Sequence, residues 1–282
     1  MKTLADDFDL KNIKQENGFD INSLLTENKK VATFIGTNKS GTSFIINNCA
    51  QVLSNRGVNV AILDTTKNKD TYYIYTKNEE GLRKTATESI EGLKNGEAKG
   101  VKVNNNLTIY TALPGTEQDS QDDVEPILET LLKNHSLILI DCDSKTPSKY
   151  FEYATEIYLV QTMDILTIQP LTEMLLELKN KRAIVDSKLR IIINKYIEMG
   201  DISIKKIIGG MSYYNDPTMT YMKELFDRNY AQYTTIPFEK EIYEEYLKAI
   251  ANCDINLDAY SYTFKQTLNR LCNEMYPMVE GE

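Results

Sequence analysis

The chain has 282 residues, 41% of them hydrophobic, and its formal net charge at neutral pH is −9. The acidic balance disfavours a nucleic-acid partner, because affinity for the phosphate backbone comes mostly from Lys and Arg. The sequence contains neither a signal-peptide pattern nor an apolar run close to the roughly 20 residues of a transmembrane segment, which predicts a cytoplasmic protein.

Short apolar segments alternate along the chain with segments of helical periodicity. The predicted strands are 31–36, 58–64, 107–113, 136–143, 156–162, 189–196 and 232–238. The predicted helices are 43–56, 79–94, 123–134, 166–181 with an interruption near Pro170, 221–227, 240–251 and 259–275, with a short helix around 21–25. We expect one domain at residues 30–282 behind a flexible arm at 1–29. The alternation predicts a three-layer α/β fold, a mostly parallel sheet with helices on both faces.

Cysteine and histidine chemistry has little support in the sequence. The four cysteines, at 49, 142, 253 and 272, form no CxxC pair and lie in apolar segments, so we expect reduced, buried thiols. The single histidine, His135, falls between a predicted helix and a predicted strand, where we expect a solvated turn. Histidine-based catalysis is therefore disfavoured.

The segment GTNKSGTS at 36–43 has the spacing of the phosphate-binding motif GxxxxGK(S/T), and it lies between a predicted strand and a predicted helix. Gly36 and Gly41 allow the backbone to curl so that its N–H groups, with that of Ser40 among them, converge on phosphate. Ser43 stands where a hydroxyl would ligate Mg²⁺. An ordinary strand-to-helix turn is the alternative interpretation.

Thr42 occupies the position of the lysine that this motif normally directs at the β- and γ-phosphates. Loss of one charge-assisted contact costs about 1.5 to 3 kcal/mol, which weakens a site built from backbone amides without abolishing it. We therefore expect nucleotide binding to survive and fast hydrolysis to be lost. Lys39, in the same loop, either swings inward as a partial substitute or stays solvated.

Asp141 ends the most apolar predicted strand, SLILID. Its position fits the Walker B carboxylate that holds a Mg²⁺-bound water. The alternative role is a strand-end carboxylate that caps the following turn. Asp143, two residues later, either reinforces the metal site or faces solvent.

Taken together, these segments resemble the MinD/ParA group of deviant P-loop ATPases over about residues 30–275. In that group a loop KGGxGKT(S/T) is followed by LDxD, a Walker B strand, an LNR or LNK strand and an IPxD segment. The corresponding stretches here are GTNKSGTS, LDTT, LILIDCD, IINKY and TIPFEKE. The resemblance implies ATP or ADP with Mg²⁺ as cofactors and allows a homodimer.

The resemblance also implies roles for individual residues. Gly41 and Ser43 would contact phosphate and Mg²⁺, and Asp141 would support the metal ion. Asn194 would read the adenine edge, although a polar turn after the strand is an equal alternative. Pro237 would border the base.

Three family positions carry threonine in this chain. Thr37 replaces the lysine that acts across an ATP-sandwich dimer, Thr42 the phosphate lysine, and Thr66 the aspartate that positions the attacking water. A Gly-Thr-Ser loop is similar to the CpaE/TadZ branch, whose members help to assemble the Flp/Tad pilus secretion apparatus. Such proteins usually carry an N-terminal receiver-like domain, and only about 30 residues precede the first predicted strand. This indicates a shortened version or a domain outside this sequence.

Two functions follow from these features. The first is an ATP-binding scaffold with weak or no hydrolysis that localises a secretion or pilus system through protein partners, with recruitment to a membrane-associated complex by protein contacts. The alternative is an active partitioning or division-site ATPase. The stretch 209–222 is a candidate partner-binding or nucleotide-flanking loop, and we expect the helix at 259–275 to pack on the body instead of inserting into a membrane.

Overall fold

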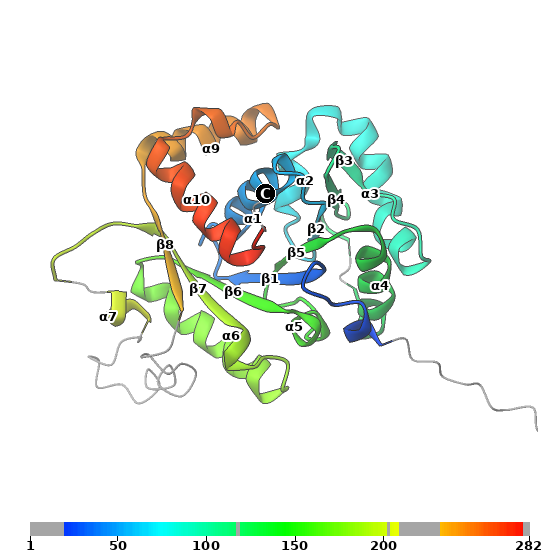
Figure 1. The fold of residues 1–282 in the computed structure, drawn as a ribbon, viewed down its shortest axis with the longest axis horizontal. Coiled ribbons are helices and arrows are strands. Elements are labelled where there is room, and N and C mark those ends of the chain that lie inside the picture. Colours follow the sequence, from blue (N-terminus) through cyan, green and yellow to red (C-terminus); the bar gives the residue numbers. More distant parts are fainter. Residues whose placement is uncertain (1–19, 117–118, 202–203, 209–231, 279–282) are drawn as a thin grey trace, which may run out of the picture.

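The computed structural model describes residues 20–116, 119–201, 204–208 and 232–278. Within these residues, one sheet of eight strands is covered by helices on both faces (Figure 1). The strands are β1 (Lys30–Gly36), β2 (Val60–Asp64), β3 (Val101–Asn104), β4 (Leu107–Tyr110), β5 (Leu137–Cys142), β6 (Glu156–Gln161), β7 (Leu189–Tyr196) and β8 (Tyr233–Pro237). The helices are α1 (Thr42–Asn55), α2 (Asp70–Ile74), α3 (Glu79–Lys94), α4 (Val124–Asn134), α5 (Lys149–Tyr153), α6 (Ile168–Asn180), α7 (Ile204–Ile208), α9 (Lys240–Asn252) and α10 (Tyr262–Met275).

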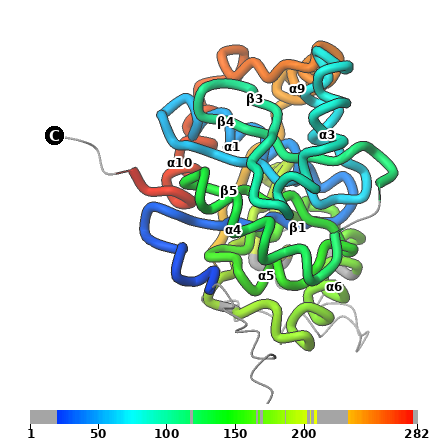
Figure 2. Tube along the Cα trace, turned by 90° about the vertical axis from the view of Figure 1, so that its right-hand side faces the viewer, coloured from blue at the N-terminus to red at the C-terminus, as the bar shows by residue number. Residues whose placement is uncertain are grey.

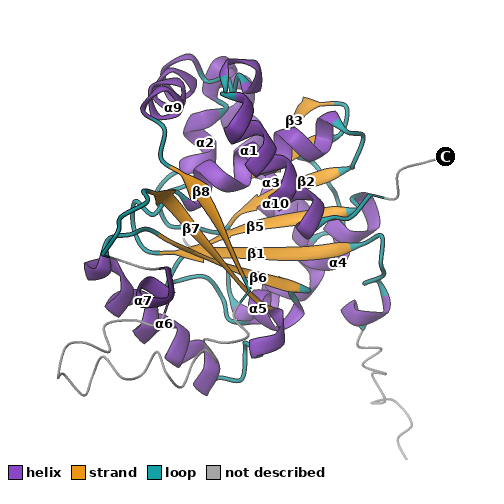
Figure 3. Cartoon of the chain, turned by 60° about the vertical axis from the view of Figure 1, so that its left-hand side comes forward, coloured by secondary structure: helices purple, strands orange, loops and turns teal. Residues whose placement is uncertain are grey.

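The strand order is β3-β4-β2-β5-β1-β6-β7-β8, and only the β3–β4 pair is antiparallel. This confirms the predicted three-layer, mostly parallel fold. The central strand β1 lies between β5 and β6, so the chain reverses its direction of travel across the sheet at this point (Figure 3). Such a reversal opens a crevice beyond the carboxyl ends of the strands, where α/β sheets bind ligands.

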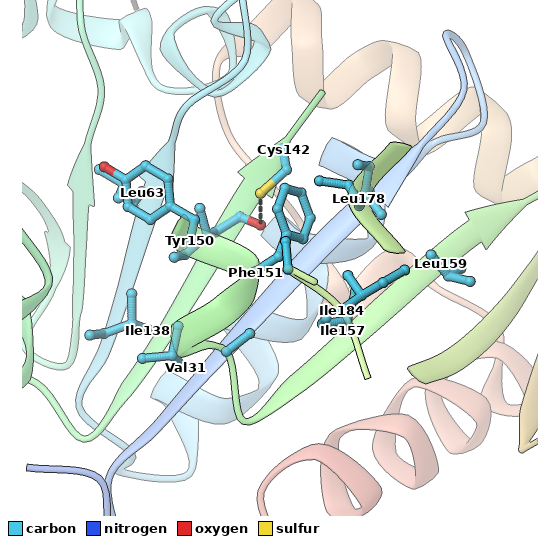
Figure 4. Packing of buried hydrophobic residues seen from close by; sticks show 14 of the residues in the cluster. Val31, Leu63, Ile138, Cys142, Tyr150, Phe151, Ile157, Leu159, Leu178 and Ile184 are labelled. Carbon is cyan, nitrogen blue, oxygen red and sulfur yellow. Dashed lines mark hydrogen bonds between the residues drawn. The ribbon is translucent and has the colours of Figure 1, made fainter. Parts of the chain in front are cut away.

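The central strands are apolar throughout because both of their faces are buried. On β1, Val31 and Ile35 join the cluster on one face of the sheet, whereas Ala32 and Phe34 join the cluster on the other. Figure 4 shows the first cluster, in which Tyr150 and Phe151 of α5 lie against the β-strand side chains. Alternation of side chains along each strand thus supplies two cores from one run of apolar residues.

Helices α1, α9 and α10 cover the face opposite α4, α5 and α6 (Figures 1 and 2). The apolar stripe of α10 is buried, as expected for a helix packed on the body; its members are Phe264, Leu268, Leu271 and Met275. These side chains share a cluster with those of α1, such as Ile45. Among the described residues, no helix is long and apolar enough to span a membrane.

Two expectations about individual segments are wrong. Residues 20–29 were expected in a flexible arm, but Ile21 is buried in the core and Lys29 donates its ammonium to the Leu132 carbonyl at 2.7 Å. His135 does not lie in a solvated turn, because it is only 7% exposed and is hydrogen bonded through both ring nitrogens. In each case tertiary contacts hold a segment whose local sequence is polar.

Several boundaries differ from the prediction. The strand expected at 107–113 ends at Tyr110, and the helix expected at 166–181 begins at Ile168, which puts Pro170 in the first turn, where proline is tolerated. The helix expected at 221–227 lies outside the described residues. All four cysteines are free; those at 49, 142 and 272 are buried as expected, whereas Cys253 is half-buried.

Candidate functional site

A cavity of about 650 Å³ opens at the carboxyl edge of the sheet. The whole segment 36–43 lines it, together with residues near the end of β7 and residues that follow β2, β5 and β8. Segments that are far apart in the sequence therefore meet at the carboxyl edge of the sheet, where a ligand was expected to bind. A cavity of this size suits a small-molecule ligand or cofactor.

The loop between β1 and α1 has the backbone curvature expected of a phosphate loop. Gly41, directly before α1, has φ +89°, and Lys39 has φ +64°, a conformation that glycine adopts more readily than lysine. A Cβ on Gly36 would collide with the Ser40 and Thr42 side chains. The close-packed loop leads into the N-terminus of a 14-residue helix, whose unpaired N–H groups and dipole attract anions.

Ser43 and Asp141 meet beneath this loop. The Ser43 hydroxyl, in the first turn of α1, donates to Oδ2 of Asp141, at the end of β5, at 2.6 Å. The structure therefore brings together the two residues that the sequence assigned to a metal ion. One hydroxyl and one carboxylate suit Mg²⁺, which keeps several waters and takes its remaining ligands from substrate phosphates.

The electrostatics around Asp141 also fit a cation. Burial raises the pKa of Asp141 well above its usual range, and the Asp64 carboxylate on the adjacent strand raises it further. Asp64 and Asp141 are direct register partners in the β2–β5 pair. Because two buried carboxylates lie side by side, a divalent cation here would relieve their repulsion. When bound, Mg²⁺ would supply charge neutralisation of the phosphates.

Asp64 itself is occupied by the turn that follows β2. Its carboxylate accepts hydrogen bonds from the Thr66 N–H and hydroxyl, at 3.0 and 2.7 Å, and from the Thr71 N–H at 3.1 Å. The buried Lys69 ammonium donates to the Asp64 carbonyl at 2.9 Å. Asp64 therefore organises the segment 65–71 and has little capacity left for ligand.

The three threonines at the altered family positions line the cavity, and two of them form hydrogen bonds within the protein. Thr42 Oγ1 lies 2.9 Å from Ser40 Oγ, and Thr66 bonds Asp64 as described. The Thr37 hydroxyl is buried without a hydrogen-bond partner. Each of these side chains is short and uncharged, so none supplies the charge of a lysine or an aspartate.

Asn194 has a different contact from the one implied by the resemblance. Its side chain, only 3% exposed, donates from Nδ2 to the Ser40 carbonyl at 2.8 Å, and it lies so close to Gly41 that a Cβ there would collide with it. The next residue, Lys195, donates from Nζ to the Lys39 carbonyl at 3.1 Å. The end of β7 thus holds two consecutive carbonyls of the phosphate loop.

Pro237 also lines the cavity, as do several aromatic side chains. Phe44, from α1, meets Tyr246, from α9, edge to face at 5.3 Å between ring centroids. Phe238 and Tyr243 are tilted against each other at 6.4 Å and remain 43% and 45% exposed. The cavity therefore combines the polar phosphate loop with aromatic side chains that suit a planar base.

Sequence reasoning missed most of the lysines that line the cavity. Besides Lys39, these are Lys67, Lys145 and Lys195. Lys67 and Lys145 follow β2 and β5, and their own N–H groups donate to Asp143 at 2.7 Å in each case. Lys67 and Lys145 could have been predicted as lining residues from their position just after predicted strands, because the loops at that edge of a parallel sheet surround the ligand.

The fold of this chain is similar to those of several solved structures. MinD from Aquifex aeolicus aligns with a TM-score of 0.64 at 15% identity, covering 90% of this chain and 100% of that chain. The fold is that of the MinD/ParA-type P-loop ATPases. A plasmid partition protein from Borrelia burgdorferi bound to AMPPNP gives a TM-score of 0.61 at 15% identity, covering 89% of this chain and 100% of that chain. MinD from Pyrococcus horikoshii complexed with Mg-ADP gives 0.56 at 16% identity, covering 88% and 96%.

No protein-family model matches the chain, and no curated protein sequence matches it. The likeness to MinD/ParA-type proteins is therefore a likeness of fold. Two of these three structures contain a bound nucleotide: AMPPNP in the Borrelia protein and Mg-ADP in the Pyrococcus protein. The narrower resemblance to the CpaE/TadZ branch stays a prediction.

Proposed function

We propose that this protein binds a Mg²⁺-nucleotide, ATP or ADP, in the cavity beside the phosphate loop and hydrolyses it slowly or not at all. The observation that carries the proposal is the 2.6 Å contact between Ser43 and Asp141 beneath a loop of phosphate-binding shape. That contact couples the first turn of α1 to the end of β5, where a Mg²⁺ ion bound to phosphate would lie.

Slow hydrolysis follows from the residues that the loop lacks. Phosphoryl transfer depends on positive charge placed on the transferring group and on a positioned water. Thr42 is turned towards Ser40, and Thr66 towards Asp64, so neither supplies these functions. A protein that binds nucleotide without turning it over acts through the conformations that the bound nucleotide favours.

For its biological role we favour a localisation or assembly factor that recruits protein partners. The Gly-Thr-Ser loop, with its similarity to the CpaE/TadZ branch, favours a Flp/Tad-type pilus or secretion system, and a homodimer is consistent with the fold class. The alternative, an active partitioning or division-site ATPase, is favoured by the similarity of the fold to those of a plasmid partition protein and a cell-division protein.

The test is a calorimetric titration of the protein with Mg-ATP, combined with an assay for phosphate release. We expect binding without appreciable release. Ser43→Ala and Asp141→Ala should each weaken Mg²⁺-dependent binding by about 10-fold or more, since each removes one metal-supporting group. Asp122→Ala, at an exposed position outside the cavity, is the matched control and should bind as the unmodified protein does.

Each other outcome has a distinct meaning. Absence of any binding would reject nucleotide binding and leave a P-loop fold used for protein contact alone. Steady phosphate release in the range of about 1 per second or more would support the active ATPase. Equal weakening by Asp122→Ala would show that the two site variants act through general stability.

A further inference from the structure

Two loops that leave neighbouring strands of the sheet line the cavity. Residues 66–68 lie in the loop after β2, residues 143–145 lie in the loop after β5, and β2 pairs with β5. An exposed loop loses conformational freedom when it closes on a ligand, and that loss opposes binding. Contacts that order both loops beforehand would therefore favour binding.

A single carboxylate joins the two loops. Asp143 accepts the Lys67 N–H on Oδ2 at 2.7 Å and the Lys145 N–H on Oδ1, also at 2.7 Å. The first of these bonds runs from one loop to the other and spans 76 positions of the sequence. Hydrogen bonds that end on a carboxylate are stronger than those between neutral groups. These two bonds are called the Asp143 bridge.

A chain of hydrogen bonds joins the same loops beneath the surface. The Asp143 N–H donates to Thr146 Oγ1 at 2.9 Å. The Thr65 hydroxyl donates to the Asp141 carbonyl at 2.7 Å, so the 3.0 Å contact between Thr65 Oγ1 and Thr146 Oγ1 uses the Thr146 proton. Both threonines are buried, and a satisfied polar network in the interior rigidifies the segments that it connects. The chain ends at Asp141, whose carboxylate holds Ser43.

The charge of Asp143 alone would be unfavourable at this position. Asp143 lines the same cavity as the phosphate loop, and a carboxylate there repels the negative charges of a polyphosphate. The backbone contacts of this carboxylate are therefore the property that could favour a bound nucleotide.

We propose that Asp143 is a positioning residue of the nucleotide site, whose carboxylate holds the loops after β2 and β5 in one arrangement before the nucleotide binds. Because the loops are already ordered, less conformational entropy is lost on binding. The inference rests on the proposed nucleotide binding. It differs from the two roles that the sequence left open for Asp143, support of the metal ion and exposure to solvent.

Amide hydrogen exchange of the ligand-free protein tests the Asp143 bridge directly. In Asp143→Ala the N–H groups of Lys67 and Lys145 lose their acceptors, so we expect both to exchange at least about 10-fold faster than in the unmodified protein. The amides at the centre of β5, a strand paired on both sides, should keep their exchange rates and show that the variant is folded. Unchanged exchange at both lysines would overturn the proposal.

Calorimetric titration with ATP, in the presence and absence of Mg²⁺, tests the role in binding. We expect Asp143→Ala to weaken binding by about 5- to 20-fold, and by a similar factor in both titrations, because the loops lose their order whether or not the metal ion is present. Asp143→Asn keeps one carbonyl oxygen as an acceptor, so it should lose less affinity.

Asp70→Asn is the matched control for charge. Asp70 lines the same cavity, but among the described residues none donates a hydrogen bond to its carboxylate. This variant removes a negative charge without releasing a loop, so its affinity for ATP should be unchanged within about 3-fold or higher.

Three results of the titrations would overturn the proposal. Equal or tighter ATP binding by Asp143→Ala would show that its charge outweighs its contacts, and a loss confined to the titration with Mg²⁺ would make Asp143 a metal-supporting residue. Equal weakening by Asp70→Asn would show a general effect of charge. In all three cases the unmodified protein still binds ATP, so the proposed function stands. If the unmodified protein binds no ATP, the positioning role fails together with the proposed function.

Discussion

His135 shows how a single buried polar residue is satisfied in this fold. Its Nδ1 lies 2.9 Å from Oδ1 of Asn59, whose own amide nitrogen donates to the Asn134 carbonyl at 2.8 Å. Asn59 Oδ1 can only accept, so Nδ1 carries the proton and Nε2 accepts from the Tyr110 hydroxyl at 2.8 Å. This arrangement uses the neutral imidazole, and protonation would require the Tyr110 hydroxyl to change from donor to acceptor.

The protonation of His135 predicts a pH-dependent stability. Burial lowers the pKa of His135 to about 4 in the folded protein, against about 6.5 in an unfolded chain. Between these values the unfolded state binds the proton and the folded state does not, so stability is complete above about pH 6.5 and falls as pH decreases towards about 4. The full loss is on the order of 3 kcal/mol.

Urea unfolding at pH 7 and pH 5 measures this loss. His135→Gln removes the titrating group, so its stability should fall less between the two pH values than that of the unmodified protein. The comparison cancels the carboxylates, which titrate in both proteins. An identical pH dependence in both would contradict the assignment.

At the site, sequence could predict residue types but not all of their contacts. The spacing of Gly36, Gly41 and Ser43 was enough to predict the phosphate loop. The apolar strand before Asp141 was enough to predict that Asp141 lies at the carboxyl edge of the sheet. Both predictions depend only on local sequence patterns. The contacts of Asn194 and Lys195 depend on a left-handed backbone at one lysine. No local sequence signal predicts that conformation for a residue other than glycine or asparagine.

At the scale of elements, the apolar strands were predictable because burial on both faces leaves a continuous run of β-rich residues. The predicted segments 31–36, 136–143, 156–162 and 189–196 match β1, β5, β6 and β7 within about one residue. The edge strand β3 was missed because its VKVN sequence is short and partly exposed. Helices α2 and α5, of five residues each, are too short to show a helical period.

Helix α10 allows a test of packing at this scale. Leu268 is 1% exposed and lies in the cluster shared with α1 and β8. Leu268→Ala should lower the free energy of unfolding by about 2 to 5 kcal/mol, because it removes apolar contacts and leaves a cavity. Urea unfolding checks this value. The control is Tyr262→Ala on the same helix, 76% exposed, which should change stability by less than about 0.5 kcal/mol.

The result also decides between two roles for α10. A helix that detaches to bind lipid would contribute little to the stability of the body, so a loss below about 1 kcal/mol for Leu268→Ala would favour that role. Because α10 packs on the body of the protein, we expect the larger loss of unfolding free energy, about 2 to 5 kcal/mol.

At the scale of the whole molecule, acidic residues outnumber basic ones, yet one cavity is lined by several lysines. The chain carries a formal charge of −9, yet four lysines line one cavity, namely Lys39, Lys67, Lys145 and Lys195. A nucleotide can be surrounded by such a cluster. A DNA duplex cannot, because it requires cations spread over an extended surface.

We therefore predict that the protein does not bind duplex DNA, with or without Mg-ATP, although a plasmid partition protein shares its fold. Fluorescence anisotropy with a labelled duplex of about 30 base pairs at about 50 mM salt is the most permissive measurement, since low salt strengthens any phosphate contact. We expect no increase in anisotropy up to about 10 μM protein. This concentration lies within the usual range of dissociation constants for non-specific DNA binding. Binding that weakens steeply with added salt would instead show a basic surface and favour the partitioning ATPase, because counterion release produces that dependence only when several Lys or Arg side chains contact phosphates.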